Sequence, residues 1–251
     1  MRTVVSFTTI PSRIARIKPM VESILAQTHK PDRFVLWLPL SCEKERAGYN
    51  VPDDLSQWML ANEVEVTNCG SDWGSATKLI PTLFSENESE TALITVDDDV
   101  VYESHMIEEL VAGSERWSQD SLGFMGGLPG PVFLHAEQLL AEGKERQEVS
   151  VLGGYRGILY RRGMFDESII DELEELLNEG PFVVDDQLFG WNLCRRGIKR
   201  YVIRTNWTGP DKGLNFKFLN LGGSIYEGES KLADESIRRL EALYARKGWK
   251  V

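Results

Sequence analysis

The sequence predicts an α/β fold in which helices flank a mainly parallel sheet, a Rossmann-like arrangement. Short β-rich runs alternate with helical patterns through the first half of the chain, as expected for right-handed βαβ crossovers. The apolar run from Ala92 to Val96 is typical of a strand buried on both faces. The 251 residues, 42% of them hydrophobic, are enough for one large domain, or for one domain with a small appendage.

The first half contains four strand candidates, and helical patterns lie between them. We expect the strands at residues 3–9, 33–38, 63–67 and 92–96. Apolar residues recur at helical spacing in the intervening segments, so we expect helices at 14–25, 55–60 and 75–84. Pro19 lies inside the first of these patterns, which predicts that the helix restarts there with proline in its first turn.

The second half is less regular. We expect a helix at 103–117, a Gly/Pro-rich loop at 123–131, a strand at 156–160, helices at 168–177 and 185–196, and a strand at 199–203. Gly197 is placed to end the second of these helices as a left-handed C-cap. The main domain is therefore expected to span 1–205. Residues 206–251 would form a loop (208–228) and an amphipathic helix (230–246), whose apolar face packs on the domain or on a second subunit to form a homo-oligomer.

Composition and charge exclude several functions. The net charge of -11 argues against non-specific binding to nucleic acid or anionic lipid. No apolar run approaches the roughly 20 residues of a membrane helix, and the N-terminus does not fit a secretory signal. Cys42, Cys69 and Cys194 are odd in number and far apart, which indicates buried or incidental thiols in a reducing compartment. These features predict a cytoplasmic enzyme without a transmembrane segment.

Three consecutive carboxylates, Asp97, Asp98 and Asp99, follow the fourth predicted strand. Adjacent like charges raise each other's pKa unless a cation offsets them, and ligands of open α/β sheets bind beyond the carboxyl ends of the strands. Hard carboxylate oxygens suit Mg²⁺ or Mn²⁺. We therefore expect Asp97 and Asp99 to point to the same side and to bind a divalent metal. The alternative is an acidic turn that caps the following helix.

Seven short motifs occur in an order that resembles the GT-A fold glycosyltransferases, especially their family 2-like inverting group with a D-x-D motif. The resemblance covers roughly residues 2–205. The motifs are VVSFTTIPSR (4–13), SILAQT (23–28), PDRFVLW (31–37), GSATK (74–78), TVDDD (95–99), GGYRGILYRR (153–162) and VDDQLF (184–189). The resemblance implies that the donor is a nucleoside diphosphate sugar, with a UDP-sugar as the default, and that the cofactor is Mn²⁺ or Mg²⁺.

The resemblance also implies roles for individual residues at the donor site. Asp99 would be the main metal ligand, with Asp97 near the donor ribose or a metal-bound water, and Asp98 a weaker candidate for either role. Residues implied to contact the nucleotide sugar are Thr8, Thr9, Pro11 and Arg13 in the first loop, Asp72 and Lys78 in a second segment, and Gly153 and Gly154. Lys78 could instead be a surface lysine on its helix.

Asp185 and Asp186 resemble the acidic pair that lies beneath the acceptor in that family. The hydroxyl of a glycan or small-molecule acceptor must lose its proton as it attacks, and a carboxylate within reach can take that proton. By position, Asp186 is the candidate base and Asp185 orients it or caps the helix. Two ordinary N-terminal caps are the alternative. Trp191 is a candidate sugar platform or a core residue.

Two other functions remain open. Asp97 to Val101 fits the D-x-D-x-[TV] pattern of haloacid-dehalogenase-type phosphatases, although that motif normally lies on an early strand and here three strand candidates precede it. A module that binds a nucleotide or glycan without catalysis could have the same fold. Many family members add a later histidine to the metal site, but this chain has only His29, His105 and His135, which predicts weak or donor-dependent metal binding.

Overall fold

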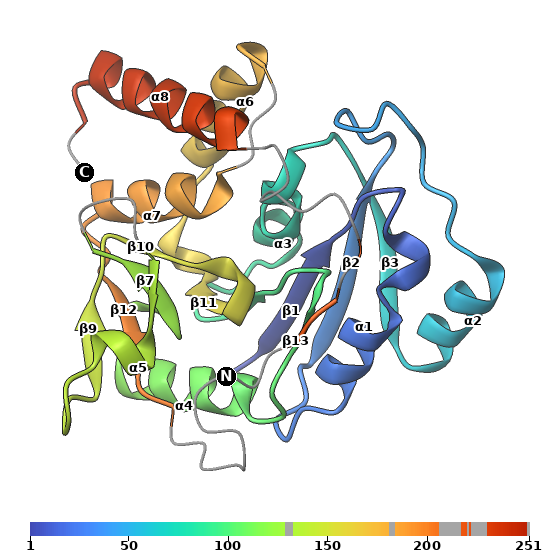
Figure 1. Ribbon diagram of the computed structural model, residues 1–251, viewed down its shortest axis with the longest axis horizontal. Coiled ribbons are helices and arrows are strands. Elements are labelled where there is room, and N and C mark those ends of the chain that lie inside the picture. The colour runs from blue at the N-terminus through green and yellow to red at the C-terminus, as the bar shows by residue number, and fades with distance from the viewer. Residues whose placement is uncertain (129–132, 181–183, 206–216, 220, 222–229, 250–251) are drawn as a thin grey trace.

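The computed structural model shows a large twisted sheet between two layers of helices, which confirms the predicted fold class (Figure 1). It describes residues 1–128, 133–180, 184–205, 217–219, 221 and 230–249. Within this part of the chain, no helix combines the length and the apolar content needed to cross a membrane. The three cysteines are free thiols, as expected, and Cys42 is buried.

The first half alternates strands and helices in the order expected. Its elements are β1 (Thr3–Thr8), the 3-10 turn η1 (Ile14–Arg16), α1 (Lys18–Leu25), β2 (Arg33–Pro39), α2 (Asp53–Ala61), β3 (Val64–Gly70), the 3-10 turn η2 (Gly74–Lys78), α3 (Ile80–Ser85) and β4 (Ala92–Thr95). Pro19 does lie in the first turn of α1. The helix expected at 75–84 is instead a 3-10 turn followed by a short helix, with Pro81 in the first turn of α3, where it needs no hydrogen bond.

The second half contains more short strands than the sequence indicated. Its elements are β5 (Val100–Val101), α4 (Met106–Arg116), β6 (Ser121–Gly123), β7 (Met125–Gly127), β8 (Phe133–His135), α5 (Ala136–Leu139), β9 (Arg146–Glu148), β10 (Val151–Leu152), the 3-10 turns η3 (Gly154–Arg156) and η4 (Arg162–Met164), β11 (Ile158–Arg161), α6 (Ser168–Asn178), α7 (Asp185–Arg195), β12 (Arg200–Ile203), β13 (Lys217–Phe218) and α8 (Ser230–Lys247). Gly197 has a positive φ of 74°, as its predicted role as a C-cap requires.

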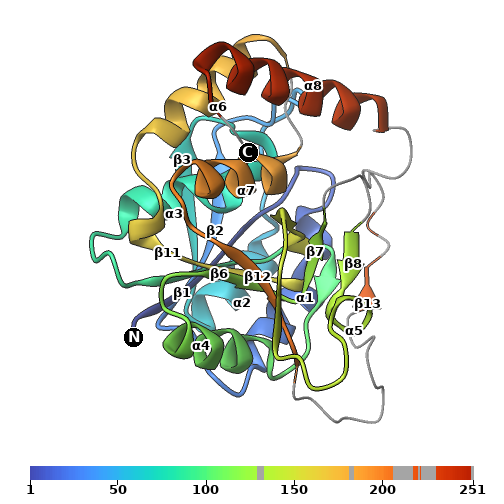
Figure 2. The ribbon, with the colours of Figure 1, turned by 90° about the vertical axis from the view of Figure 1, so that its left-hand side faces the viewer.

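Eight strands form the main sheet in the order β3-β2-β1-β4-β11-β6-β12-β9. Strands β1 to β4 are mutually parallel, whereas β11 is antiparallel to both of its neighbours. A three-stranded sheet of β10, β7 and β8 lies beside the main sheet (Figure 2). Because β1 and β4 are adjacent and parallel, the residues that follow them meet at the same sheet edge, and this edge carries the acidic triplet.

Alternate residues of each central strand face opposite helical layers. Val4 and Leu93 belong to the core that contains α3, α6, α7 and α8, whereas Val5 and Ile94 belong to the core that contains α1, α2 and α4. This follows from the period of two along a strand. The central strands are therefore buried on both sides, and the residues after their carboxyl ends have a rigid support.

The prediction of a loop at 123–131 is wrong in part, because Gly123 is the last residue of β6 and residues 125–127 form β7. A Cβ atom at Gly126 would lie 2.8 Å from both Val149 Cγ2 and the Val151 carbonyl oxygen. This glycine therefore permits close packing of a strand and does not mark a turn. Residues 129–131 of that prediction lie outside the described residues.

The predicted loop 208–228 lies mostly outside the described residues. Its described part includes β13, which pairs antiparallel with β5, and the Leu219 N–H donates a hydrogen bond to the Asp99 carbonyl oxygen at 2.6 Å. The C-terminal helix α8 lies against α6 and α7 (Figures 1 and 2), with Leu240, Leu243 and Tyr244 buried in the main core. The apolar face of α8 thus packs on its own domain.

Candidate active site

The acidic triplet lies just beyond β4, next to the loop that follows β1. Thr9 Oγ1 donates a hydrogen bond to Asp98 Oδ2 at 2.6 Å. Arg13 Nη1 lies 2.9 Å from Asp98 Oδ1 and 3.3 Å from Asp99 Oδ2. Two of the residues predicted in the first loop therefore contact the triplet directly, and Asp98 turns towards that loop.

Asp97 pairs with a different cation. Its Oδ1 lies 2.6 Å from Lys78 Nζ, and its backbone N–H donates a hydrogen bond to the Tyr102 hydroxyl oxygen at 2.7 Å. Asp97 and Asp99, which we expected to point to the same side, are thus ion-paired with separate side chains from separate elements. The alternative placement of Lys78 on the surface is wrong, because the side chain is only 8% exposed.

The second acidic pair opens α7, and Lys78 brings it next to Asp97. Asp185 Oδ2 lies 3.0 Å from Lys78 Nζ, and the Gly154 N–H donates a hydrogen bond to Asp186 Oδ2 at 2.9 Å. These five residues come from four elements that are distant in sequence: η2, the end of β4, η3 and α7. The structure therefore gathers the two acidic motifs around one buried lysine.

The cluster has more acid than base, and its pKa values reflect this imbalance. Burial, together with the charges of Asp97 and Asp98, raises the pKa of Asp99 to about 6. Burial, together with the charge of Asp185, raises the pKa of Asp186 to about 8. A carboxylate with a pKa near neutrality inside a cluster of charged groups is a typical feature of active sites.

The same carboxylates act on Lys78. Burial opposes the charge of this ammonium group, but Asp185 and Asp97 outweigh it and hold the pKa of Lys78 well above its usual range. Lys78 is therefore a permanent cation at neutral pH.

The other predicted residues lie around this cluster. Thr8 Oγ1 donates a hydrogen bond to the Trp37 carbonyl oxygen at 2.9 Å, and the Gly153 N–H donates to the Met125 carbonyl oxygen at 3.0 Å. Pro11 lies in the turn between β1 and η1 and is partly exposed. These contacts fix the backbone at the edge of the site.

Asp72 and Trp191 contact residues outside the cluster. The Asp72 carboxylate accepts hydrogen bonds from the N–H groups of Gly74 at 2.8 Å and Glu43 at 2.7 Å, which shapes the turn after β3. Trp191 packs edge-on against Tyr244 with ring centroids 5.3 Å apart, at the margin of the main core. Packing is therefore the observed role of Trp191.

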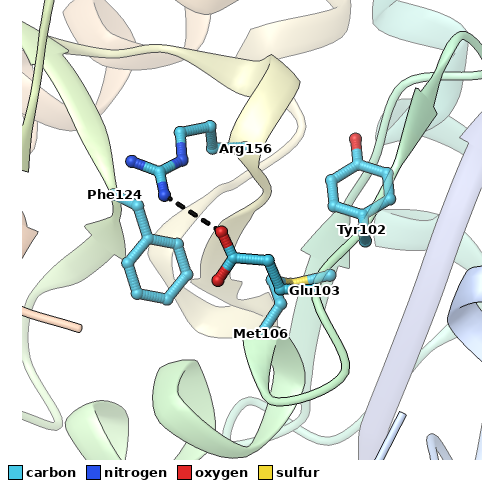
Figure 3. Close-up of a pocket in the computed structure, with 5 residues that line it drawn as sticks. All are labelled: Tyr102, Glu103, Met106, Phe124 and Arg156. Carbon is cyan, nitrogen blue, oxygen red and sulfur yellow. Dashed lines mark hydrogen bonds and ion pairs between the residues drawn. The ribbon is translucent and has the colours of Figure 1, made fainter. Parts of the chain in front are cut away.

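A small pocket lies beside the triplet and was not predicted from the sequence (Figure 3). It is lined by Tyr102, Glu103, Met106, Phe124 and Arg156. Arg156 Nη2 lies 3.4 Å from Glu103 Oε1, and the guanidinium lies over the Phe124 ring. Arg156 was part of a quoted motif, but the other four residues lie in no recognisable pattern, because the fold alone brings them together.

The carboxylates fit a divalent cation only in part. Among the described residues, no three His, Cys, Asp or Glu side chains are grouped so that they could hold a metal by themselves. The Asp97 and Asp99 side chains are 29% and 21% exposed, and the raised pKa of Asp99 indicates negative charge that a cation would relieve. Two partly exposed carboxylates suit Mg²⁺ or Mn²⁺, which take their remaining ligands from phosphate oxygens and water.

Comparison with known proteins shows the fold. No protein-family model and no curated protein match the sequence, whereas many solved structures match the coordinates. Staphylococcus aureus TarS is similar at a TM-score of 0.50 and 15% identity, over 80% of this chain and 35% of that one. The 1–349 fragment of TarS in complex with UDP-GlcNAc has a TM-score of 0.50 and 16% identity, over 80% of this chain and 56% of that one. GalNAc-T7 with UDP, GalNAc and Mn²⁺ has a TM-score of 0.56 and 11% identity, over 81% of this chain and 42% of that one.

These neighbours are GT-A glycosyltransferases, and the chain has their fold. It spans between about a third and a little over half of the length of the chains that it matches.

Proposed function

We propose that this chain is a glycosyltransferase that moves a sugar from a nucleoside diphosphate sugar, in the first place a UDP-sugar, to a hydroxyl group of a glycan or small molecule. The observation that carries this proposal is the meeting of two acidic motifs, Asp97–Asp99 and Asp185–Asp186, around Lys78. Structures with the same fold were solved with UDP-GlcNAc, and with UDP, GalNAc and Mn²⁺.

The donor would bind beyond the carboxyl ends of the central strands β1 and β4. The loop from Thr8 to Arg13 and the turn at Asp72 would contact the nucleoside, and Gly153 and Gly154 would let the donor approach the backbone closely. Asp99 and Asp97 would hold Mn²⁺ or Mg²⁺ against the diphosphate. When bound, this cation supplies positive charge that stabilises the departing nucleoside diphosphate.

Asp186 would be the general base. The Gly154 N–H fixes one of its carboxylate oxygens at 2.9 Å, and the raised pKa makes this carboxylate basic enough to take the proton of an attacking hydroxyl. In a single displacement the hydroxyl attacks the anomeric carbon from the face opposite to the diphosphate. The bond to the acceptor oxygen forms as the bond to the phosphate oxygen breaks, and the configuration of the sugar inverts.

The fold favours this proposal over the phosphatase, because its structural neighbours are glycosyltransferases and because the triplet follows the fourth strand along the chain. A binding module without catalysis would keep the fold and the nucleotide site. It would have no need for a buried carboxylate with a pKa near 8, that of Asp186, within the second acidic motif.

Release of nucleoside diphosphate from a panel of UDP-, GDP- and dTDP-sugars tests the proposal, measured with and without Mn²⁺ and with simple sugar acceptors. We expect release from one donor that requires Asp186 and increases with acceptor. Asp171→Asn, a change at an exposed carboxylate on α6, is the matched control. Phosphate release from p-nitrophenyl phosphate without transfer would favour the phosphatase. Donor binding without any turnover would favour the binding module.

A further inference from the structure

We propose that Lys78 is a positioning residue that ties the donor-side carboxylate Asp97 to the acceptor-side pair on α7, and that it does not contact the nucleotide. This inference rests on the proposed function, and it revises the role that the sequence motif implied for Lys78. Three features of the structure support it.

First, the backbone of Lys78 is fixed to the central sheet. Lys78 is the last residue of η2, and its carbonyl oxygen accepts a buried hydrogen bond of 2.6 Å from Ser6 Oγ on β1. Within the same turn, Thr77 Oγ1 accepts a hydrogen bond of 3.1 Å from the Trp73 N–H. The side chain therefore starts from a rigid point beneath the sheet edge.

Second, the ammonium group connects two elements that are far apart in the sequence. Nζ lies 2.6 Å from Asp97 Oδ1, at the end of β4, and 3.0 Å from Asp185 Oδ2, in the first turn of α7. A Cβ atom on Gly154 would lie 3.3 Å from this Nζ and 2.8 Å from Asp186 Oδ1. Nζ thus also lies close to the candidate base.

Third, the Lys78 ammonium group is enclosed and lies against acidic side chains. Nζ donates a hydrogen bond to Asp97 Oδ1 at 2.6 Å and lies at ion-pair distance, 3.0 Å, from Asp185 Oδ2. The side chain is 8% exposed, so a nucleoside base has little access to it.

The charge of Lys78 is needed where it lies. Three carboxylates converge on it, and the mutual repulsion of buried like charges is strong when no cation offsets it. Without Nζ, Asp185 would move away from Asp97, whose backbone N–H remains hydrogen-bonded to the Tyr102 hydroxyl. Because Asp186 follows Asp185 on the same helix turn, the base would move with it. A displacement of about 1 Å at a reacting group can cost about 100-fold in rate.

The test uses four variants: Lys78→Met, Lys78→Arg, Asp185→Asn and the double variant Lys78→Met/Asp185→Asn. We would measure kcat, the KM for donor and acceptor, and the Kd for UDP with Mn²⁺ by calorimetry. Lys199→Met is the matched control. This exposed lysine directly precedes β12 and pairs at 3.0 Å with Glu148, the last residue of β9, and both strands lie at the end of the main sheet, remote from the triplet.

For Lys78→Met we expect kcat to fall by about 100-fold, while the Kd for UDP stays within about threefold of wild type. Lys78→Arg keeps the charge and is expected to recover part of kcat. The double variant removes Asp185, the more buried of the two carboxylates that Lys78→Met leaves without a cation, so it is expected to be more stable to unfolding than Lys78→Met alone. It thereby gives a folded protein even if the single variant does not fold.

Loss of UDP binding in parallel with kcat would overturn the inference, because Lys78 would then be a nucleotide contact. A wild-type kcat in Lys78→Met would also overturn it. Additive effects of Lys78→Met and Asp185→Asn on the free energy of unfolding would do the same, because they would show that the two residues are not coupled. If the wild-type protein turns over no donor at all, it is the proposed function that fails. In that case the Kd for UDP and the coupling between Lys78 and Asp185 in the free energy of unfolding still test the positioning role of Lys78, because neither measurement requires turnover.

Discussion

The Asp186 carboxylate accepts a hydrogen bond of 2.9 Å from the backbone N–H of Gly154, so that a glycine holds the candidate base by its main chain. The approach is close. A Cβ atom at this position would lie 2.8 Å from Asp186 Oδ1, nearer than Cβ atoms come to such an oxygen. Gly154 is therefore needed for the position of Asp186, in addition to any approach of a donor.

Gly154→Ala is expected to displace the Asp186 carboxylate and to lower kcat by about 10- to 100-fold. Stability should change little, because the carboxylate is the end of a side chain and can turn away. Steady-state kinetics and urea denaturation check both parts. Gly48→Ala is the control, since nothing lies within 4 Å of the Cβ position at Gly48. Equal kinetics in the two variants would contradict this reading of Gly154.

Asp186→Asn removes the basic oxygen but keeps the size of the side chain. A general base contributes about 100- to 10,000-fold to a rate, and we expect a fall of kcat within this range. The Kd for UDP should be unchanged, because Asp186 lies on α7, on the side of the cluster that we propose for the acceptor. Single-turnover transfer measurements and calorimetry provide the two values. Wild-type kcat in this variant would show that another group takes the proton.

The pH dependence of transfer follows from the pKa of Asp186. Burial and Asp185 raise this pKa to about 8, and a base acts only when it is deprotonated. We therefore expect kcat/KM to rise with pH up to about 8 and to level off above it. The rising limb should be absent from the residual activity of Asp186→Asn. A profile that is flat between about pH 6 and pH 9 in the wild-type protein would argue against Asp186 as the base.

A buried carboxylate connects the three helices α6, α7 and α8. Glu172 on α6 accepts hydrogen bonds from Asn192 Nδ2 at 2.9 Å, from Arg195 Nη2 at 2.7 Å and from the Tyr244 hydroxyl at 3.0 Å. Two of these partners lie on α7 and one lies on α8.

Glu172→Ala would leave the Arg195 guanidinium without this partner and Asn192 without an acceptor. We expect a loss of about 3 kcal/mol in the free energy of unfolding, measured by urea denaturation. Glu174→Ala, at an exposed position on the same helix, should cost less than about 0.5 kcal/mol. Similar losses in both variants would show that α8 is not held by this network.

Much of the fold could be predicted from the sequence, because the central strands are strongly apolar and the helices between them keep a regular spacing. Strands β1, β2 and β4 begin at the expected residues. The short strands were missed for a physical reason. Elements of two or three residues, such as β5, β10 and β13, have no measurable period, and their strand geometry comes from partners distant in sequence.

The candidate site was predicted as residues but not as contacts. The sequence gives no sign that Lys78 reaches Asp97 and Asp185, because ion pairs across the fold have no local pattern. The same holds for Tyr102, whose hydroxyl accepts a hydrogen bond from the Asp97 N–H. The roles of the predicted residues in donor binding and catalysis remain predictions, and the experiments above test them.

The most direct test of the central claim is a thermal-shift panel of UDP, GDP, dTDP and CMP, each with and without Mn²⁺. A ligand that binds only the folded state raises its stability by mass action. We expect one nucleoside diphosphate, in the first place UDP, to raise the Tm only when Mn²⁺ is present, and this shift to disappear in Asp99→Ala. No shift with any nucleotide, in the presence or absence of Mn²⁺, would contradict a nucleotide-sugar transferase.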